Sequence, residues 1–379
     1  CLDNTGQKDC TAALRQIVND ILGAYEKEFY KTKAKLEQMP DPKALISFEI
    51  RKVDGRCNVI FPEQLPPSRI IYFPNGTYLV SDTISYAMEE FRNIICDLRH
   101  LEMNCQLRFM GQSRNGVIIK LKDHCPGFEF GNDRPVICFM QGEASNIAMT
   151  NMFENITVDV GSGNPGATGI RYFANNTGAL RNVKIVSSDP EYRGNTGLSV
   201  LHDKVSACYA KNVEVIGFNY GIKIMSQYLY TTFEHIVLKH QKRTGFYVGN
   251  NAVFIRDLYS ENSVSALKVD GFTAFVSLID AQLLGGAEQD VAIRHSFGQL
   301  FLRNIKAEGY EHILDKGWSF MRPEPIDGYL KEYSSHGPKT LFEGTNSLSL
   351  NLPVLETPEV PWDDPEDWVS VQEFGAVGD

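Results

Sequence analysis

The sequence predicts an all-β fold, a right-handed parallel β-helix with an amino-terminal capping helix. The main observation is a short motif, a polar residue followed by an aliphatic one, that recurs at intervals of 22 to 30 residues. Irregular spacing of this size is typical of the coils of a β-solenoid. The first residues of the repeats are Asn155, Asn182, Asn212, His235, Asp257, Asp280 and Asn304.

The second observation is the alternation of polar and apolar residues that follows the motif, for example over residues 182–186 and 212–216. A period of two predicts strands with one buried face. A coil of about 22 residues has room for two or three such strands and their turns. Because one coil cannot bury its own apolar face, neighbouring coils must stack on it.

Glycine-rich breaks between these strands are the third observation. They fall at residues 166–169, 194–197, Gly221 and Gly245. We expect positive φ angles and sharp corners there, since glycine adopts such angles at little cost. An antiparallel sandwich would use the same short strands, but hairpin dipeptides are sparse and the motif recurs in phase, which favours the solenoid.

Residues 1–45 are predicted to form a helical cap. Apolar residues recur at helical spacing between residues 10 and 38, and Asp9 or Thr11 is placed to cap the start of the helix. A β-helix has to cover its terminal coil, because the exposed backbone groups of that coil would otherwise pair with other chains. We therefore expect this helix to close the amino-terminal end.

Residues 46–322 are predicted to form the β-helix itself. After an irregular stretch up to residue 67, a strand, a Pro-Asn-Gly turn and a second strand occupy residues 69–81, and coils continue to about residue 317. Residues 323–379 lose this rhythm and contain four prolines within thirteen residues. We interpret them as an extended linker leading to the start of a second β-helix.

Composition narrows the choice of partner. A net charge of -10 argues against nucleic acid or an anionic membrane, both of which attract clustered lysine and arginine. A neutral or weakly charged polymer fits better. No run approaches the roughly 18 apolar residues of a membrane span, and the chain opens at Cys1 without a basic and then apolar region, so we expect neither a span nor a retained leader.

The eight cysteines form no Cys-x-x-Cys pair and no cluster with histidine at zinc spacing. We therefore expect no metal and no cofactor. Several cysteines, such as Cys96 and Cys138, lie in apolar strand contexts where a reduced thiol packs as a small hydrophobic group. We expect a secreted or cell-surface protein, although free thiols leave a cytoplasmic location open.

Several segments resemble one family. Residues 72–80, Tyr-Phe-Pro-Asn-Gly-Thr-Tyr-Leu-Val, resemble an element of pectate-lyase-superfamily β-helices, and residues 374–379, Phe-Gly-Ala-Val-Gly-Asp, resemble the element that opens such a domain. Residues 352–358, Leu-Pro-Val-Leu-Glu-Thr-Pro, resemble the linker between the two tandem β-helices of glycoside hydrolase family 55. Further similar segments span residues 217–222, 233–241, 258–262, 303–310 and 332–336.

The resemblance implies hydrolysis of a β-1,3-glucan-like polysaccharide with inversion at the anomeric carbon. In the family the acidic machinery lies mostly in the second β-helix, facing a cleft between the two. This chain would then supply the first β-helix and part of the cleft, with the general acid outside residues 1–379. An inverting site also needs a base that activates water.

Candidate catalytic residues are Gln241 and Ser260, which lie one coil apart in the matching segments and can orient a water molecule without titrating. Glu261 and Asn262 follow and are candidates for catalysis and substrate binding, respectively. Adjacent strand residues point to opposite faces, so we expect only some of the four to share a surface. A satisfied polar ladder is the alternative.

Aromatic side chains near turns are candidates for stacking against sugar rings. Tyr228, Tyr230 and Trp318 are the substrate-binding candidates of this kind, with burial as the alternative. Three functions remain open at this stage. They are a glycoside hydrolase, a carbohydrate-binding or structural β-helix without chemistry of its own, and a tailspike-type or lyase-type β-helix.

Overall fold

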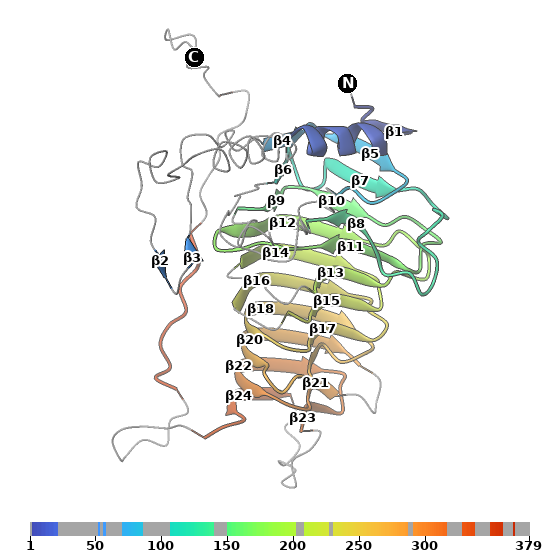
Figure 1. The fold of residues 1–379 in the computed structure, drawn as a ribbon. Helices are drawn as coiled ribbons and strands as arrows, with labels where there is room; N and C mark the ends of the chain where they lie inside the picture. Colours follow the sequence, from blue (N-terminus) through green and yellow to red (C-terminus); the bar gives the residue numbers. More distant parts are fainter. Residues whose placement is uncertain are drawn as a thin grey trace. The chain divides into compact units, whose positions relative to one another are not determined.

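The computed structural model describes residues 2–21, 52–53, 56–57, 70–85, 107–139, 150–201, 208–226, 230–286, 291–316, 328–337, 349–358 and 367. The chain divides into two compact units, Cys1–His336 and Gly337–Asp379. The first unit is a stack of β-coils, as predicted, and successive strands lie side by side along it (Figure 1). Within the described residues, no helix is long and apolar enough to cross a membrane.

Two sheets form the walls of the coils. The larger has 14 described strands, and its path is β1 (Thr5–Asp9), β5 (Gly76–Val80), β7 (Val117–Leu121), β10 (Thr157–Asp159), β12 (Gly178–Val186), β14 (Cys208–Ile216), β16 (Tyr230–Lys239), β18 (Ala252–Asn262), β20 (Phe275–Gly285), β22 (Gln299–Glu308) and β24 (Tyr329–Ser334). Off this path, β4 (Ile70–Phe73) pairs with β6 (Arg108–Gly111), which pairs with β9 (Met152–Glu154).

The smaller sheet has eight described strands. They are β8 (Arg134–Cys138), β11 (Ala167–Arg171), β13 (Thr196–Val200), β15 (Tyr220–Ile224), β17 (Thr244–Val248), β19 (Leu267–Val269), β21 (Val291–His295) and β23 (His312–Lys316). Both sheets are parallel except where β24 pairs antiparallel with β22. The sequence did not predict β1 or β24, which lie in the segments expected to form the cap and the linker. A separate antiparallel pair joins β2 (Lys52–Val53) to β3 (Arg56–Cys57).

Each long strand of the larger sheet is bent once, at the polar residue of the repeated motif. All seven such residues have φ angles between 53° and 58°. Asparagine, aspartate and histidine tolerate this left-handed region better than most residues, which explains why the motif begins with them. Their side chains also bond between coils, since Asn182 donates to Asn155 at 2.8 Å and Asn304 donates to Asp280 at 2.6 Å. We call this row the corner ladder.

The glycines between the strands were predicted to have positive φ angles, and this prediction was wrong. Gly166, Gly169, Gly194, Gly197, Gly221 and Gly245 are absent from the positive-φ glycines of the described chain. Glycine is needed at these positions because a side chain would not fit. A Cβ on Gly197 would lie 2.2 Å from Val215, and one on Gly169 would lie 2.3 Å from Ile185, both in the facing sheet.

Apolar side chains stack in register through the interior. Val213, Ile236, Leu258, Ala281 and Ile305 occupy the same position in five successive coils and are buried. Full burial of such an aliphatic side chain contributes about 1.5–3 kcal/mol. The coils near the amino terminus are filled by a chain of aromatic rings in tilted or edge contact, Phe73, Phe109, Phe139, Phe153 and Tyr172.

The amino-terminal end is closed as predicted, as far as the structure describes it. Residues 11–21 are helical, and Leu14 and Val18 are buried in the same core (Figure 1). The Asp9 carboxylate accepts the backbone N–H of Thr11 at 2.9 Å. The expected continuation of the helix to residue 38 lies outside the described residues. Cys10, Cys125, Cys138 and Cys208 are free thiols, as expected.

Candidate functional site

The accessible polar side chains lie on the outer face of the long strands, on the carboxyl-terminal side of the corner ladder. Alternation decides which residues reach this face. In β18, Leu258, Ser260 and Asn262 are buried inside the coil, whereas Tyr259 and Glu261 point outward. Tyr259 donates a hydrogen bond to the Glu261 carboxylate at 3.3 Å, so the two outward residues are linked. Two pockets lie along this outer face.

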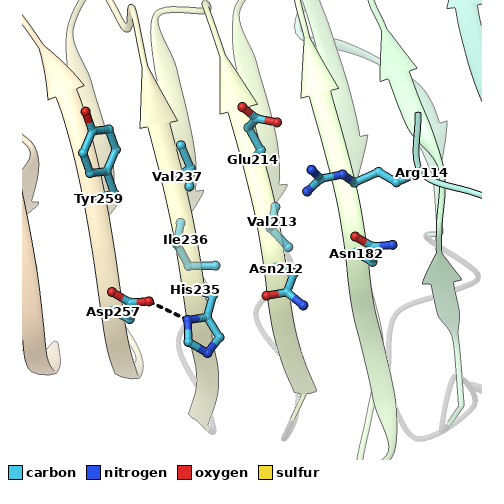
Figure 2. Close-up of a pocket in the computed structure, with 10 residues that line it drawn as sticks. All are labelled: Arg114, Asn182, Asn212, Val213, Glu214, His235, Ile236, Val237, Asp257 and Tyr259. Carbon is cyan, nitrogen blue, oxygen red and sulfur yellow. Dashed lines mark hydrogen bonds and ion pairs between the residues drawn. The ribbon is translucent and has the colours of Figure 1, made fainter. Parts of the chain in front are cut away.

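The first pocket lies over the corner ladder and has a volume of about 430 Å³ (Figure 2). His235 Nδ1 and the Asp257 carboxylate lie 2.5 Å apart on neighbouring coils. Arg114 lies in the turn between β6 and β7. Its backbone carbonyl accepts a hydrogen bond from the Thr157 hydroxyl at 2.6 Å. The other lining residues are Asn182, Asn212, Val213, Glu214, Ile236, Val237 and Tyr259.

The first pocket therefore mixes both signs of charge with amide groups. Glu214 forms an ion pair with Lys184 of the preceding coil at 3.7 Å. Carboxylate, amide and guanidinium groups spread over several coils suit a ligand with many hydroxyl groups, each of which can donate and accept. The histidine and its carboxylate partner also form a hydrogen-bonded pair of a kind that can transfer a proton.

The second pocket lies where the long strands end and has a volume of about 500 Å³. Its wall is a stacked pair of rings, Tyr192 and His240, with centroids 4.4 Å apart and an interplanar angle of 14°. The remaining lining residues are Gln241, Lys242, Glu261, Asn262, Ser263, Gly285 and Gly286. A flat aromatic surface beside a carboxylate is an arrangement that can stack a sugar ring and bind its hydroxyl groups.

Glu261 is the acidic residue of the second pocket. Its hydrogen bond and ion pair with Lys239, at 3.2 Å, lower the pKa of the carboxyl group, and the Tyr259 hydroxyl adds to the effect. The side chain is 46% exposed, so solvent and a ligand can reach it. An ionised, accessible carboxylate can act as a general base.

The Tyr192 ring is positioned by a turn built around a buried carboxylate. Asp189 accepts the backbone N–H groups of Gly163 at 2.8 Å and Glu191 at 2.9 Å. It also accepts two hydrogen bonds from Arg193, at 3.0 and 3.1 Å. Burial raises the pKa of Asp189, but these hydrogen bonds outweigh burial and hold the pKa well below its ordinary value.

The candidates predicted from the sequence fall into two groups. Glu261 reaches the outer surface, but Gln241, Ser260 and Asn262 are buried. The Gln241 amide donates to the carbonyls of Val215, Gly217 and Lys239.

The buried candidates form a network inside the coil. Asn262 accepts the Gln241 backbone N–H at 2.6 Å and donates to the Ser260 hydroxyl at 2.8 Å. The register places Leu238, not Gln241, beside Ser260, so the two predicted stacking partners are not aligned.

The aromatic candidates lie elsewhere. Tyr230 begins β16, on the far side of the corner ladder from Glu261, and is 52% exposed. Tyr228 and Trp318 lie outside the described residues. Tyr192 and His240 are not predicted by any local pattern, because their contact joins two loops 48 positions apart. The sequence predicts His235 and Asp257 only as members of the repeated motif.

No group of three or more histidine, cysteine, aspartate or glutamate residues able to hold a metal ion occurs in the described part of the chain. A search of curated proteins finds no match to this chain. The family model described as rhamnogalacturonase A/epimerase, pectate lyase-like, matches residues 2–282. This match agrees with the parallel coils and supports the predicted resemblance to the pectate-lyase superfamily. It does not confirm the narrower resemblance to glycoside hydrolase family 55. The chain belongs to the rhamnogalacturonase A/epimerase, pectate lyase-like family of carbohydrate-active proteins.

Proposed function

We propose that this protein binds a polysaccharide across the outer face of its long strands and supplies the base for inverting hydrolysis of a β-1,3-glucan-like chain. The observation that carries the proposal is the second pocket. There an exposed carboxylate with a lowered pKa, Glu261, lies beside the stacked rings of Tyr192 and His240. Family membership supports a carbohydrate ligand.

In this mechanism Glu261 takes a proton from water, and the water oxygen bonds to the anomeric carbon as the bond to the leaving group breaks. Tyr192 and His240 hold a sugar ring by stacking, and Lys239 keeps Glu261 ionised. Inverting hydrolysis also needs a carboxylic acid that protonates the leaving oxygen. We propose that this acid comes from outside residues 1–379, as the resemblance to family 55 implies.

The β-1,3-glucan assignment rests on that resemblance and on the charge of the chain. A net charge of -10 disfavours a polyanion as the bulk ligand. A secreted or cell-surface location follows from a polymeric substrate and is part of the same proposal. Pectic polymers remain the alternative substrate, since the family description names rhamnogalacturonase.

A second candidate function is polysaccharide binding without chemistry. The observation in its favour is that Gln241, Ser260 and Asn262 are engaged in hydrogen bonds inside the coil, which leaves Glu261 as the one predicted catalytic residue on the surface. A single carboxylate can bind hydroxyl groups without activating water. The two candidates differ in whether Glu261 is needed for turnover or only for affinity.

An activated substrate separates the two candidates, because a fluoride leaving group departs without protonation and so bypasses the general acid. We expect the chain to release fluoride from β-laminaribiosyl fluoride, giving the α-anomer of the product by NMR. The Glu261→Gln variant should be slower by about 10²-fold, the lower end of general-base effects. The matched control is Glu308→Gln, since Glu308 lies exposed in the same row two coils away.

No fluoride release by the wild type, together with laminarin binding, would favour the binding module and exclude the catalytic proposal. Galactan, mixed-linkage glucan and polygalacturonate should be tested in parallel by reducing-sugar release and by ultraviolet absorbance. Unsaturated products from polygalacturonate would instead establish a lyase.

A further inference from the structure

Exposed aromatic side chains also lie on the larger sheet before the corner ladder. Tyr230 of β16 is 52% exposed, Phe254 of β18 is 38% exposed and Phe275 of β20 is 38% exposed. These strands are neighbours in the sheet (Figure 1). We call these three residues the aromatic platform. Exposed large apolar side chains grouped on three successive coils often mark a binding site.

The register gives the platform a defined spacing. Tyr230 pairs with Ala252, which pairs with Phe275, so the two aromatic residues occupy the same position two coils apart. Two strand separations amount to about 10 Å. Two sugar residues of an extended β-linked polysaccharide have a comparable length. Phe254 lies two residues further along the intervening strand, and its ring centroid is 5.9 Å from that of Phe275.

The residues in the same rows as these rings are uncharged, whereas the next row toward the corner ladder carries the charged pair Glu234 and Arg256. Thr232 and Ser277 flank Phe254 in its row, and Ala252 and Gln299 lie in the row of Tyr230 and Phe275. Hydroxyl and amide groups next to flat rings can hydrogen-bond the edges of stacked sugars.

We propose that the aromatic platform is a second carbohydrate site, which binds an uncharged, extended β-linked polysaccharide by stacking alternate sugar rings on Tyr230 and Phe275. It is separate from the pocket at Glu261, because the corner residue Asp257 and about 20 Å of strand lie between Phe254 and Glu261. The platform holds the polymer without taking part in the reaction. The ligand class rests on the proposed function, but the location does not depend on Glu261.

The test is a depletion assay with insoluble β-1,3-glucan and cellulose, using the wild type and the double variant Tyr230→Ala/Phe275→Ala. We expect affinity for at least one polymer to fall by about tenfold, equivalent to about 1.4 kcal/mol. Release of fluoride from β-laminaribiosyl fluoride should be unchanged. The matched control is Phe130→Ala, which removes a ring that is 79% exposed elsewhere on the surface and should leave binding intact.

Unchanged binding by the double variant, or an equal loss in Phe130→Ala, would overturn the platform. The proposal would also be overturned if the double variant lost self-association but kept glycan binding, because that result would identify a protein interface. A failure of the proposed function gives a different result. In that case neither the wild type nor any variant releases fluoride, while polymer binding still depends on Tyr230 and Phe275. Conversely, Glu261→Gln should lose fluoride release and keep binding to insoluble polymer.

Discussion

The inner and outer faces of β18 differ in what their polar residues do. Ser260 and Asn262 point into the coil and bond to one another and to the backbone of the preceding coil. Glu261, between them, points outward and has an accessible carboxylate. Neighbouring polar residues on one strand therefore have separate roles, set by the direction of the side chain.

The largest expected effect is on the inner face. The Asn262→Ala change leaves the buried backbone N–H of Gln241 without its acceptor and removes the hydrogen bond to Ser260. An unsatisfied buried group costs about 1–3 kcal/mol, so we expect a loss of about 2–3 kcal/mol in the free energy of unfolding. Urea unfolding measures it. Glu261→Ala is the matched control, expected within about 0.5 kcal/mol of the wild type; equal losses would refute the distinction between the faces.

Asp189, a buried carboxylate outside β18, makes the free energy of unfolding depend on pH. Its folded pKa lies below its unfolded value, so its contribution to stability is present at neutral pH and is lost as the pH falls below about 4. We expect Asp189→Asn to be destabilised by about 2 kcal/mol at pH 7 and to show a smaller further loss at acid pH than the wild type. Unfolding midpoints across this range test it, and parallel pH profiles would contradict it.

The corner ladder predicts a smaller effect. At Asp280, with φ of 58°, alanine loses the hydrogen bond from Asn304 and is also strained, whereas glycine loses only the hydrogen bond. Left-handed backbone costs about 1–2 kcal/mol for ordinary residues. We expect Asp280→Ala to be about 1 kcal/mol less stable than Asp280→Gly by thermal unfolding. The opposite order would show that the backbone angle does not explain the choice of residue.

On the outer face, Lys239→Met tests the electrostatics rather than the fold. Lys239 lowers the pKa of Glu261, so its removal should raise that pKa. A general base must be ionised, and activity should therefore be lost at a higher pH on the acid side of the rate profile. The pH dependence of fluoride release is the measurement. An acid limb that does not move would mean that Glu261 is not the base.

Much of the fold follows from the sequence because a repeated coil repeats its local chemistry. All seven predicted motif residues have a left-handed backbone, which few residue types tolerate. The glycines were given the wrong reason, because a periodic pattern shows where small residues recur but not what faces them. Gly197 faces Val215 across the interior, and that contact needs the structure.

The site is less predictable, because alternation along a strand does not fix the register between coils. Gln241 and Ser260 are one coil apart in sequence, yet Leu238 is the residue paired with Ser260. Coil lengths vary, so counting residues misses by a few positions. The Tyr192 and His240 stack depends on loops from coils that are not adjacent in sequence, and neither residue carries a local motif.

In the proposed function, the surface at Glu261 and Tyr192 binds the polysaccharide. Isothermal titration with soluble laminarin, mixed-linkage glucan, galactan and polygalacturonate oligosaccharides tests it most directly, on the wild type, Tyr192→Ala and the control Glu308→Gln. We expect the wild type to bind at least one glycan, with affinity weakened by about tenfold in Tyr192→Ala and unchanged in Glu308→Gln. Equal affinity in all three proteins, or no binding of any glycan by the wild type, would contradict it.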